Sequence, residues 1–193
     1  LQKRIDEIYT DICKKNKDGE LVTKQIFLKL VNIVESESGS RAVSRRAYHN
    51  EFVGEAVESN LKRFIDENLL VSNYEYSSKD KLSIGTTTKL IQNATIEIAH
   101  EILLSSWDKL KRWLEEEKEA IILKNWLVGE TRRWLEVRAE NKSKASEEFL
   151  KGARLDQIVE FRDKNAFEKV GGLVEQENEF IDTSVEWRDR EYK

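Results

Sequence analysis

The chain has 193 residues, of which 39% are hydrophobic and 36% charged, and its formal net charge is −4. This composition is typical of a folded, helix-rich protein, and the mild negative charge excludes the basic footprint of most nucleic-acid-binding domains. No apolar run reaches the roughly 18 residues that span a membrane, and the single Cys13 excludes an internal disulfide and is typical of a cytoplasmic protein.

The sequence starts inside a helical pattern and contains no methionine, so we expect a piece excised from a larger protein. Residues 1–13 repeat apolar side chains at helical spacing, and the turn signal Asp18-Gly19 separates this helix from the next. The next helix is predicted to be capped by Thr23 and to run through residues 25–34. Its apolar face would carry Ile26, Phe27, Leu30 and Val34.

Residues 35–46 are polar and predict a connection that ends in a short strand at residues 42–44. A short helix is expected near residues 48–52. A longer helix over residues 55–68 follows it, because apolar side chains recur there on one face. That face would carry Val57, Leu61, Phe64 and Ile65.

Two strands are predicted at residues 69–76 and 94–99, where β-branched, aromatic and aliphatic side chains gather. The polar residues 77–94 between them predict a long hairpin loop. The resulting order is helix, short strand, short helix, helix, strand, loop and strand. This is the order of a winged helix-turn-helix with a small β-hairpin.

From Glu101 onward the pattern is helical. Leu103, Trp107, Leu110 and Leu114 follow one helix face, and we assign the tryptophans to core packing rather than to ligand stacking. Ser146 is a predicted helix start after a polar break, and Gly171-Gly172 precede a last helix. We therefore expect a mainly α chain: the end of a preceding helical segment at 1–19, a winged-helix domain at 20–100 and a helical linker domain, folded as a bundle, at 101–193.

The chemistry-bearing motifs of most enzymes are absent from the sequence. It has no glycine-rich phosphate loop, no paired-histidine zinc motif and no nucleophile elbow, and its two histidines, His49 and His100, lie far apart. We expect no catalytic residue and no metal site, and a buried, inert Cys13. The chain by itself is therefore not expected to be an enzyme.

Winged helices often bind DNA through their third helix, which enters the major groove. Here the helix over residues 55–68 carries more acidic side chains than basic ones, and only Lys62 and Arg63 oppose them. Arg41, Arg45 and Arg46 are weak evidence for phosphate contact and fit solvated loop charges better. The charge pattern therefore argues against nucleic-acid binding.

The stretch from residue 96 to residue 135 reads IEIAHEILLSSWDKLKRWLEEEKEAIILKNWLVGETRRWL. A strand that ends in Ala-His-Glu, followed by W-x-x-L-x-x-W-L and an acidic run, resembles the region after the nucleotide-binding core of bacterial STAND ATPases, which are signal-transducing relatives of NACHT and NB-ARC proteins. QIFLKLV, SGSRAVSRRAYHNEF, NLKRFIDENLLV, FLKGARLDQIVEF and ENEFIDTS extend the resemblance over most of residues 20–187.

The resemblance implies a regulatory module that packs on an intramolecular NTPase domain and couples its ATP or ADP state to C-terminal sensor repeats, of the WD or tetratricopeptide type. Many relatives act in bacterial signalling or defence, and the parent protein could oligomerise. By analogy with the Met-His-Asp motif of NB-ARC proteins, His100 would contact the ADP phosphate and Glu101 would occupy the place of the aspartate. Ala99 stands where that motif has methionine. No cofactor is expected in this chain alone.

Three alternatives remain open from the sequence. His100 could instead cap a helix or satisfy a buried hydrogen bond. The chain could be a winged-helix DNA-binding transcription regulator with a helical dimerisation region. It could also be a passive scaffold whose helical half docks a partner.

Overall fold

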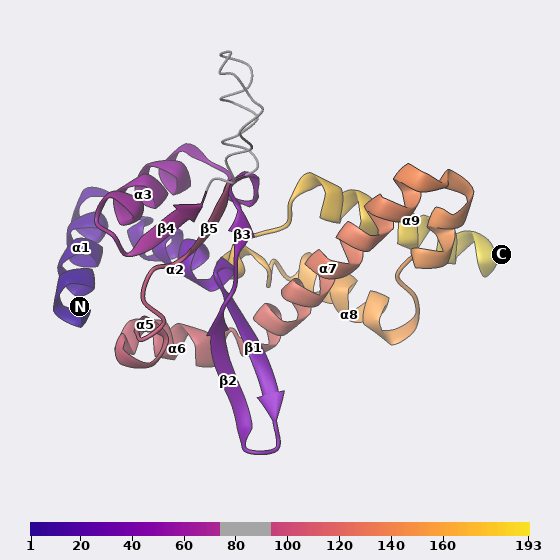
Figure 1. Cartoon of the computed structure of the whole chain (residues 1–193). Helices are drawn as coiled ribbons and strands as arrows, with labels where there is room; N and C mark the ends of the chain where they lie inside the picture. Colours follow the sequence, from indigo (N-terminus) through magenta and orange to yellow (C-terminus); the bar gives the residue numbers. More distant parts are fainter. Residues whose placement is uncertain (74–93) are drawn as a thin grey trace, which may run out of the picture. The chain divides into compact units, whose positions relative to one another are not determined.

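The computed structural model describes residues 1–73 and 94–193, which form two compact units, Leu1–Glu117 (unit 1) and Lys118–Lys193 (unit 2) (Figure 1). The described chain is mainly helical with small antiparallel sheets, as predicted. None of its helices is both long and apolar enough to cross a membrane. Most of the predicted loop at 77–94 lies outside the described residues. The predicted domain boundaries stay predictions.

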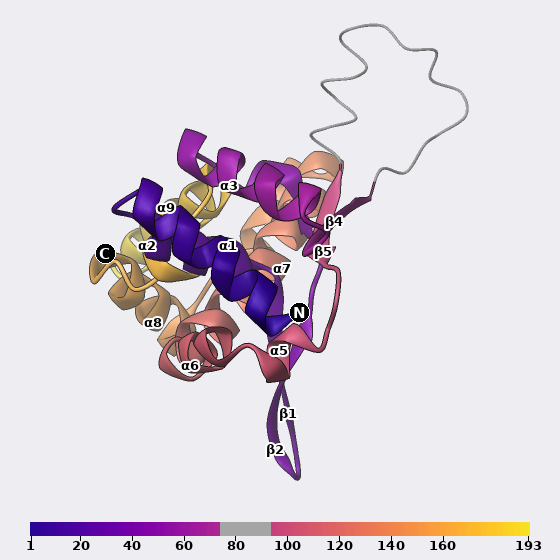
Figure 2. The same cartoon turned by 90° about the vertical axis from the view of Figure 1, so that its left-hand side faces the viewer.

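Unit 1 begins with α1 (Gln2–Lys15) and α2 (Gly19–Lys29), which pack together (Figure 2). The predicted stripe of α1 is buried at Ile5, Ile8, Tyr9 and Ile12. The turn between the helices needs glycine, because a Cβ atom at Gly19 would lie 2.9 Å from the carbonyl oxygen of Ile12. The predicted turn signal therefore reflects a close approach of two backbones.

The helix predicted over residues 25–34 with Thr23 as its cap is wrong at both ends. It begins at Gly19, so Thr23 is buried within it, and it ends at Lys29. Strands β1 (Val31–Ser36) and β2 (Gly39–Ser44) form an antiparallel hairpin there, with Ser36 opposite Gly39. Three β-branched residues of β1 favour the extended backbone, and Gly39 at the turn has a φ of 112° that suits glycine. Val34, expected on a buried helix face, is 41% exposed. Figures 1 and 2 show the hairpin projecting as a two-stranded ribbon.

A second sheet has three strands in the order β3-β5-β4: β3 (Ala47–Tyr48), β5 (Thr95–Ile98) and β4 (Leu70–Asn73). Both pairings are antiparallel, with Ala47 opposite Ile96 and Leu70 opposite Ile98. The two predicted strands are thus confirmed where the chain is described. The 3-10 helix η1 (His49–Glu51) and helix α3 (Glu55–Asp66) lie between β3 and β4 in the sequence, close to the predicted bounds.

The predicted stripe after the sheet folds as two short helices, α5 (Leu103–Ser106) and α6 (Asp108–Glu116), with Trp107 between them. Trp107 is fully buried, and its ring centroid lies 5.2 Å from that of Phe27 and 5.4 Å from that of Trp113. Its indole N–H donates to Asp6 Oδ1 at 2.8 Å. Tyr9 meets both tryptophans edge to face. Core packing of these tryptophans is therefore confirmed.

Replacing Trp107 with alanine should destabilise unit 1 by about 3–5 kcal/mol, because it leaves a cavity among these rings and removes the bond to Asp6. Trp107→Phe, which keeps an aromatic ring, should cost less. Urea unfolding of the three proteins measures the difference. Trp126→Ala is the control, since Trp126 is only half-buried in unit 2 beneath Arg154. An equal loss in the control would contradict a central role for Trp107.

Unit 2 is all helical, as predicted for a bundle. It contains α7 (Lys118–Glu140), the 3-10 helix η2 (Lys142–Glu148), α8 (Gly152–Asp163), the 3-10 helix η3 (Glu168–Val170) and α9 (Glu175–Glu191). Ser146 does not start a helix, because η2 runs through it and is capped by the side chain of Asn141. In the core, Trp134 stacks on Phe180 with ring centroids 4.9 Å apart.

Two buried polar contacts fix α9 in unit 2. Ser184 Oγ accepts from the Leu150 amide at 3.0 Å and donates to the Phe180 carbonyl at 2.8 Å. The Lys124 ammonium donates to both carboxylate oxygens of Glu177, one of them at 2.7 Å, and both side chains are at most 6% exposed. Such groups are costly to bury without partners, so these contacts favour one position of the helix.

Ser184→Ala should destabilise unit 2 by about 1–3 kcal/mol, because the buried Leu150 amide loses its acceptor. Thr183→Ala on the same helix is the control, since Thr183 is only half-buried. Thermal unfolding followed by circular dichroism compares the two variants. If the two substitutions cost the same, the Ser184–Leu150 bond contributes nothing specific.

Candidate functional site

The predicted site residues lie in the tight turn that joins β5 to α5. The side chains of Ile96 and Ile98 on β5 are buried. The Ala99 amide donates to the Leu69 carbonyl at 3.0 Å. On the other side of the turn, Leu103 and Leu104 are buried. The backbone of the turn is therefore held from both ends by the core.

Between these anchors the side chains of His100, Glu101 and Ile102 face solvent, and Ile102 is 59% exposed. The His100 carbonyl accepts from the Leu103 amide, and the Glu101 carbonyl accepts from the Leu104 amide, both at 3.0 Å. The N-cap residue of α5 is Ile102, and no side-chain hydrogen bond caps that helix. His100 is thus neither buried nor a cap of α5, and its imidazole is presented outward on a fixed backbone.

A polar contact adjoins the turn on β5. Glu97, half-buried, accepts from Arg46 Nε and from the Asn73 side-chain amide, each at 2.9 Å. Because Arg46 precedes β3 and Asn73 ends β4, this one carboxylate ties together all three strands of the sheet. The contact stiffens the strand that leads into His100.

The three arginines considered as loop charges have different environments. Arg45 is half-buried, donates to the Lys29 carbonyl at 2.8 Å and lies 3.5 Å from a Glu51 carboxylate oxygen. Arg46 pairs with Glu97, and Arg41 is exposed on β2. Arg45 and Arg46 therefore hold the base of the hairpin and the sheet. Sequence reasoning missed this role, because the partners are distant in the chain.

The basic side chains of α3 are also engaged within unit 1. Arg63 donates to Asp11 on α1 at 2.6 Å, and Lys62 pairs with Asp66 at 2.9 Å. Arg4 on α1 binds Glu67 at the end of α3 at 2.7 Å. Neither cation of α3 is free to approach a nucleic-acid phosphate without losing an ion pair, which adds to the charge argument against DNA binding.

Hydrogen bonds from Lys15 and Arg63 hold the pKa of the Asp11 carboxyl below its ordinary value of 3.8. The ionised form is therefore favoured by folding, and its contribution is complete above the unfolded pKa and is lost as pH falls through the native pKa. Asp11→Asn should lower the stability of unit 1 at neutral pH, and the gap from the wild type should narrow once the pH is below 3.8 and close as it falls through the lowered native pKa. Urea midpoints across this range measure it.

Asp66→Asn is the matched control for Asp11, because Asp66 is an exposed carboxylate that pairs with Lys62 one turn earlier in the same helix. Its replacement should change stability less than Asp11→Asn does at neutral pH. A gap between Asp11→Asn and the wild type that stays constant with pH would contradict the proposed contribution of the ionised carboxylate.

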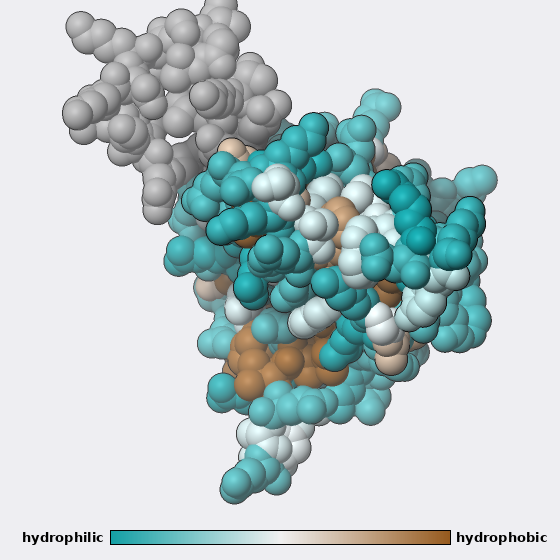
Figure 3. Space-filling view, turned by 90° about the vertical axis from the view of Figure 1, so that its right-hand side faces the viewer, coloured by the Kyte–Doolittle hydropathy of each residue, from teal (hydrophilic) through white to brown (hydrophobic). Residues whose placement is uncertain are grey.

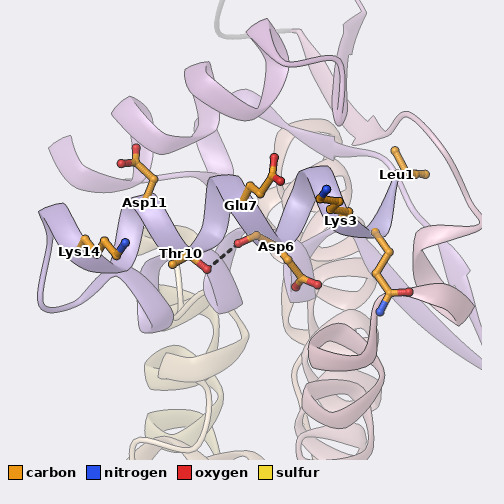
Figure 4. A pocket seen from close by; sticks show the side chains of 8 residues that line it. Leu1, Lys3, Asp6, Glu7, Thr10, Asp11 and Lys14 are labelled. Atoms are coloured by element: carbon orange, nitrogen blue, oxygen red, sulfur yellow. Dashed lines mark hydrogen bonds between the residues drawn. The ribbon is translucent and has the colours of Figure 1, made fainter.

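A hollow of about 850 Å³ lies along α1 and is lined by Leu1 and side chains of that helix alone (Figure 4). The visible side chains are mostly charged, and the Thr10 hydroxyl donates to the Asp6 carbonyl at 2.7 Å. Because one helix face forms the lining, polar groups do not converge on a point as they do in ligand pockets. The hollow is not a candidate small-molecule site.

Three other kinds of surface feature could form a site: metal-ligand clusters, a free cysteine and apolar patches. Within the described residues, no three histidine, cysteine, aspartate or glutamate side chains gather as metal ligands would. Cys13 is half-buried rather than fully buried. The face in Figure 3 is mostly hydrophilic, with an apolar patch above the tip of the hairpin. The turn at His100 therefore remains the candidate functional site.

Comparison with known protein families identifies a match over most of the chain. The family model of Novel STAND NTPase 1 matches residues 1–142, which include all of unit 1 and helix α7. No curated protein and no solved structure matches the chain. The match covers more than half of the sequence and includes the predicted site residues. The chain therefore belongs to the Novel STAND NTPase 1 family.

Proposed function

We propose that this chain is the regulatory module of a STAND NTPase. Unit 1 would pack on the nucleotide-binding core of the parent protein and sense whether ADP is bound. Unit 2 would transmit that state to C-terminal sensor repeats. The observation that carries the proposal is the turn at His100, whose backbone is fixed by the core while its side chains are exposed.

We assign unit 1 to the winged-helix class on the order of its elements. Helix α2, strand β3, helices η1 and α3, and strands β4 and β5 follow one another, and β3 pairs with β5. The β1–β2 hairpin would be an insertion between the first helix and the first strand of that fold. A second helix of only three residues would be a further departure.

His100 suits one contact to a nucleotide rather than a whole binding site. An exposed imidazole can donate a hydrogen bond to a phosphate oxygen, whereas the neighbouring Glu101 carboxylate would repel the same phosphate. Glu101 would therefore accept from donors of the NTPase core. The phosphate loop and the metal ligands would belong to that core, so ATP or ADP would be held by the parent protein and not by this chain.

In this proposal the chain itself has no catalytic role, because the phosphate loop and the metal ligands belong to the NTPase core. The parent protein would be a cytoplasmic ATPase. The partners of this chain would be the NTPase domain and the sensor repeats of the same polypeptide, with oligomerisation of the parent as one route to signalling. A role in bacterial defence would fit the wider STAND class. The transcription-regulator alternative is set aside, because the cations of α3 are committed to Asp11 and Asp66.

His100→Ala in the full-length parent should accelerate ADP release by about ten- to hundredfold, because one hydrogen bond to a charged phosphate is lost. The nucleotide content of the purified protein and the release rate of a fluorescent ADP analogue measure the effect. His100→Gln, which keeps a donor, should retain part of the ADP affinity.

His49→Ala is the matched control, since it removes the other histidine of unit 1 far along the sequence from the turn. Its ADP content should equal that of the wild type. Unchanged ADP content in His100→Ala, with unit 1 folded, would exclude His100 as the nucleotide contact. Loss of ADP in both histidine variants would indicate a general loss of structure instead.

A further inference from the structure

The β1–β2 hairpin has two outer edges, and its register shows which residues face them. Along an antiparallel strand, residues alternate between bonding to the partner strand and pointing their backbone groups outward. The Arg45 amide donates to the Leu30 carbonyl at 2.9 Å, so this pair bonds inward. Counting from it, the residues that point outward are Val31, Ile33 and Glu35 on β1, and Ser40, Ala42 and Ser44 on β2.

The outer edge of β1 is closed by its own side chains. The outward amide of Ile33 donates to the side-chain oxygen of Asn32 at 2.9 Å. This donor cannot pair with another strand without losing that bond. Nearer the tip, Glu35 is exposed and adds a negative charge to the same edge. Both features are of the kind that keeps an edge strand from accepting a neighbour.

The outer edge of β2 lacks this protection. Within the described chain, the outward amides of Ser40 and Ala42 form no hydrogen bond. Helix α5 lies beside β2 near the base of the hairpin (Figures 1 and 2), so the open part of the edge is toward the tip. Unpaired backbone groups along an exposed strand are a template for a further strand.

The side chains of β2 define what a further strand should carry. Arg41 and Val43 lie on one face, and Arg41 is exposed and forms no ion pair in the described chain. In an antiparallel addition, the residue opposite Arg41 occupies a closely spaced, non-bonded position, where a carboxylate can pair with the guanidinium. The other face carries only small side chains, which leave room for larger ones: Ser40, Ala42 and Ser44.

We propose that the outer edge of β2 is a strand-addition site for an extended segment of a partner protein. The segment carries an acidic side chain opposite Arg41 and larger side chains opposite Ser40 and Ala42. A second copy of this chain does not meet these requirements, because its β1 edge is closed at Ile33 and its β2 edge would bring a second arginine to the same ladder. The site is independent of the nucleotide contact proposed for His100.

A capped synthetic peptide, Ser-Tyr-Thr-Val-Glu-Tyr-Ser, tests the site on the full chain. Aligned antiparallel to β2, it places glutamate opposite Arg41, valine opposite Ala42 and a tyrosine opposite Ser40. At saturating peptide, hydrogen exchange followed by NMR should show about tenfold or greater protection of the Ser40 and Ala42 amides. The Ile33 amide should keep the protection that it has in the free protein.

A proline substitution tests the backbone contribution. Ala42→Pro removes an outward amide that the hairpin ladder does not use, and it should weaken peptide binding by about tenfold or more. Glu35→Pro is the matched control, because Glu35 has the equivalent outward position on the closed edge of β1. Its peptide affinity should equal that of the wild type.

A charge exchange tests the side-chain contribution. Arg41→Glu should weaken binding of the glutamate peptide by about five- to tenfold, and a peptide with lysine in place of glutamate should recover the affinity. Circular dichroism reports whether each variant is folded. If Ala42→Pro unfolds the hairpin, the charge exchange at Arg41 decides.

Absence of peptide binding at millimolar concentration overturns the proposal. Binding that Ala42→Pro and Glu35→Pro weaken equally, or that ignores the charge exchange, overturns it as well. Protection of Ser40 and Ala42 that rises with protein concentration in the absence of peptide would assign the edge to a second copy instead. No measurement involves a nucleotide, so a failure here is distinguishable from a failure of His100 as the ADP contact.

Discussion

The packing of Trp107 is the constraint on which unit 1 depends. It is the one residue between α5 and α6, and its ring contacts reach Tyr9 of α1, Phe27 of α2 and Trp113 of α6. Its indole N–H also binds Asp6, so the ring has a fixed orientation as well as a fixed place. The turn that carries His100 lies only a few residues before it in the chain. The Trp107 amide also bonds to the Leu103 carbonyl, so the buried indole fixes the end of the short helix that follows this turn.

Ion pairs within each unit engage several of its charged side chains. In unit 1, Arg63, Arg46 and Lys24 are each paired with a carboxylate. In unit 2, Lys124 is paired with Glu177. These pairs join residues far apart in the chain. From the sequence alone, the same charged side chains would be candidates for docking or for contact with nucleic acid. The turn at His100 presents exposed side chains on a backbone that hydrogen bonds hold.

The sequence predicted much of the helical framework and the two principal strands, because each has a clear hydrophobic period. It failed at β1, where Ile26, Phe27, Leu30 and Val34 imitate one helix face although the chain changes to a strand after Leu30. It failed again at Ser146, where a polar residue before two glutamates looks like a helix start. Local signals of this kind cannot show which backbone the distant contacts will select.

Part of the candidate site could also be predicted from the sequence, and part could not. The position of His100 at a strand-to-helix junction follows from the change of period around it, and the structure places it there. The anchors of that turn, such as the bond from Ala99 to Leu69, and the contact of Lys24 with Glu117 join residues far apart in the chain. A single sequence carries no pairing information over such distances, so these contacts emerge only from the folded structure.

The projecting β1–β2 hairpin has a consequence for solubility. Within the described chain its sheet has only two strands, so each strand has one neighbour and one outer edge. Such edges can add strands from other molecules, a route to aggregation. Glu35, Glu37 and Arg41 are exposed around the tip, and charges at an edge oppose that addition. The exposed charges around the tip therefore oppose edge-to-edge pairing of this hairpin between copies of the chain.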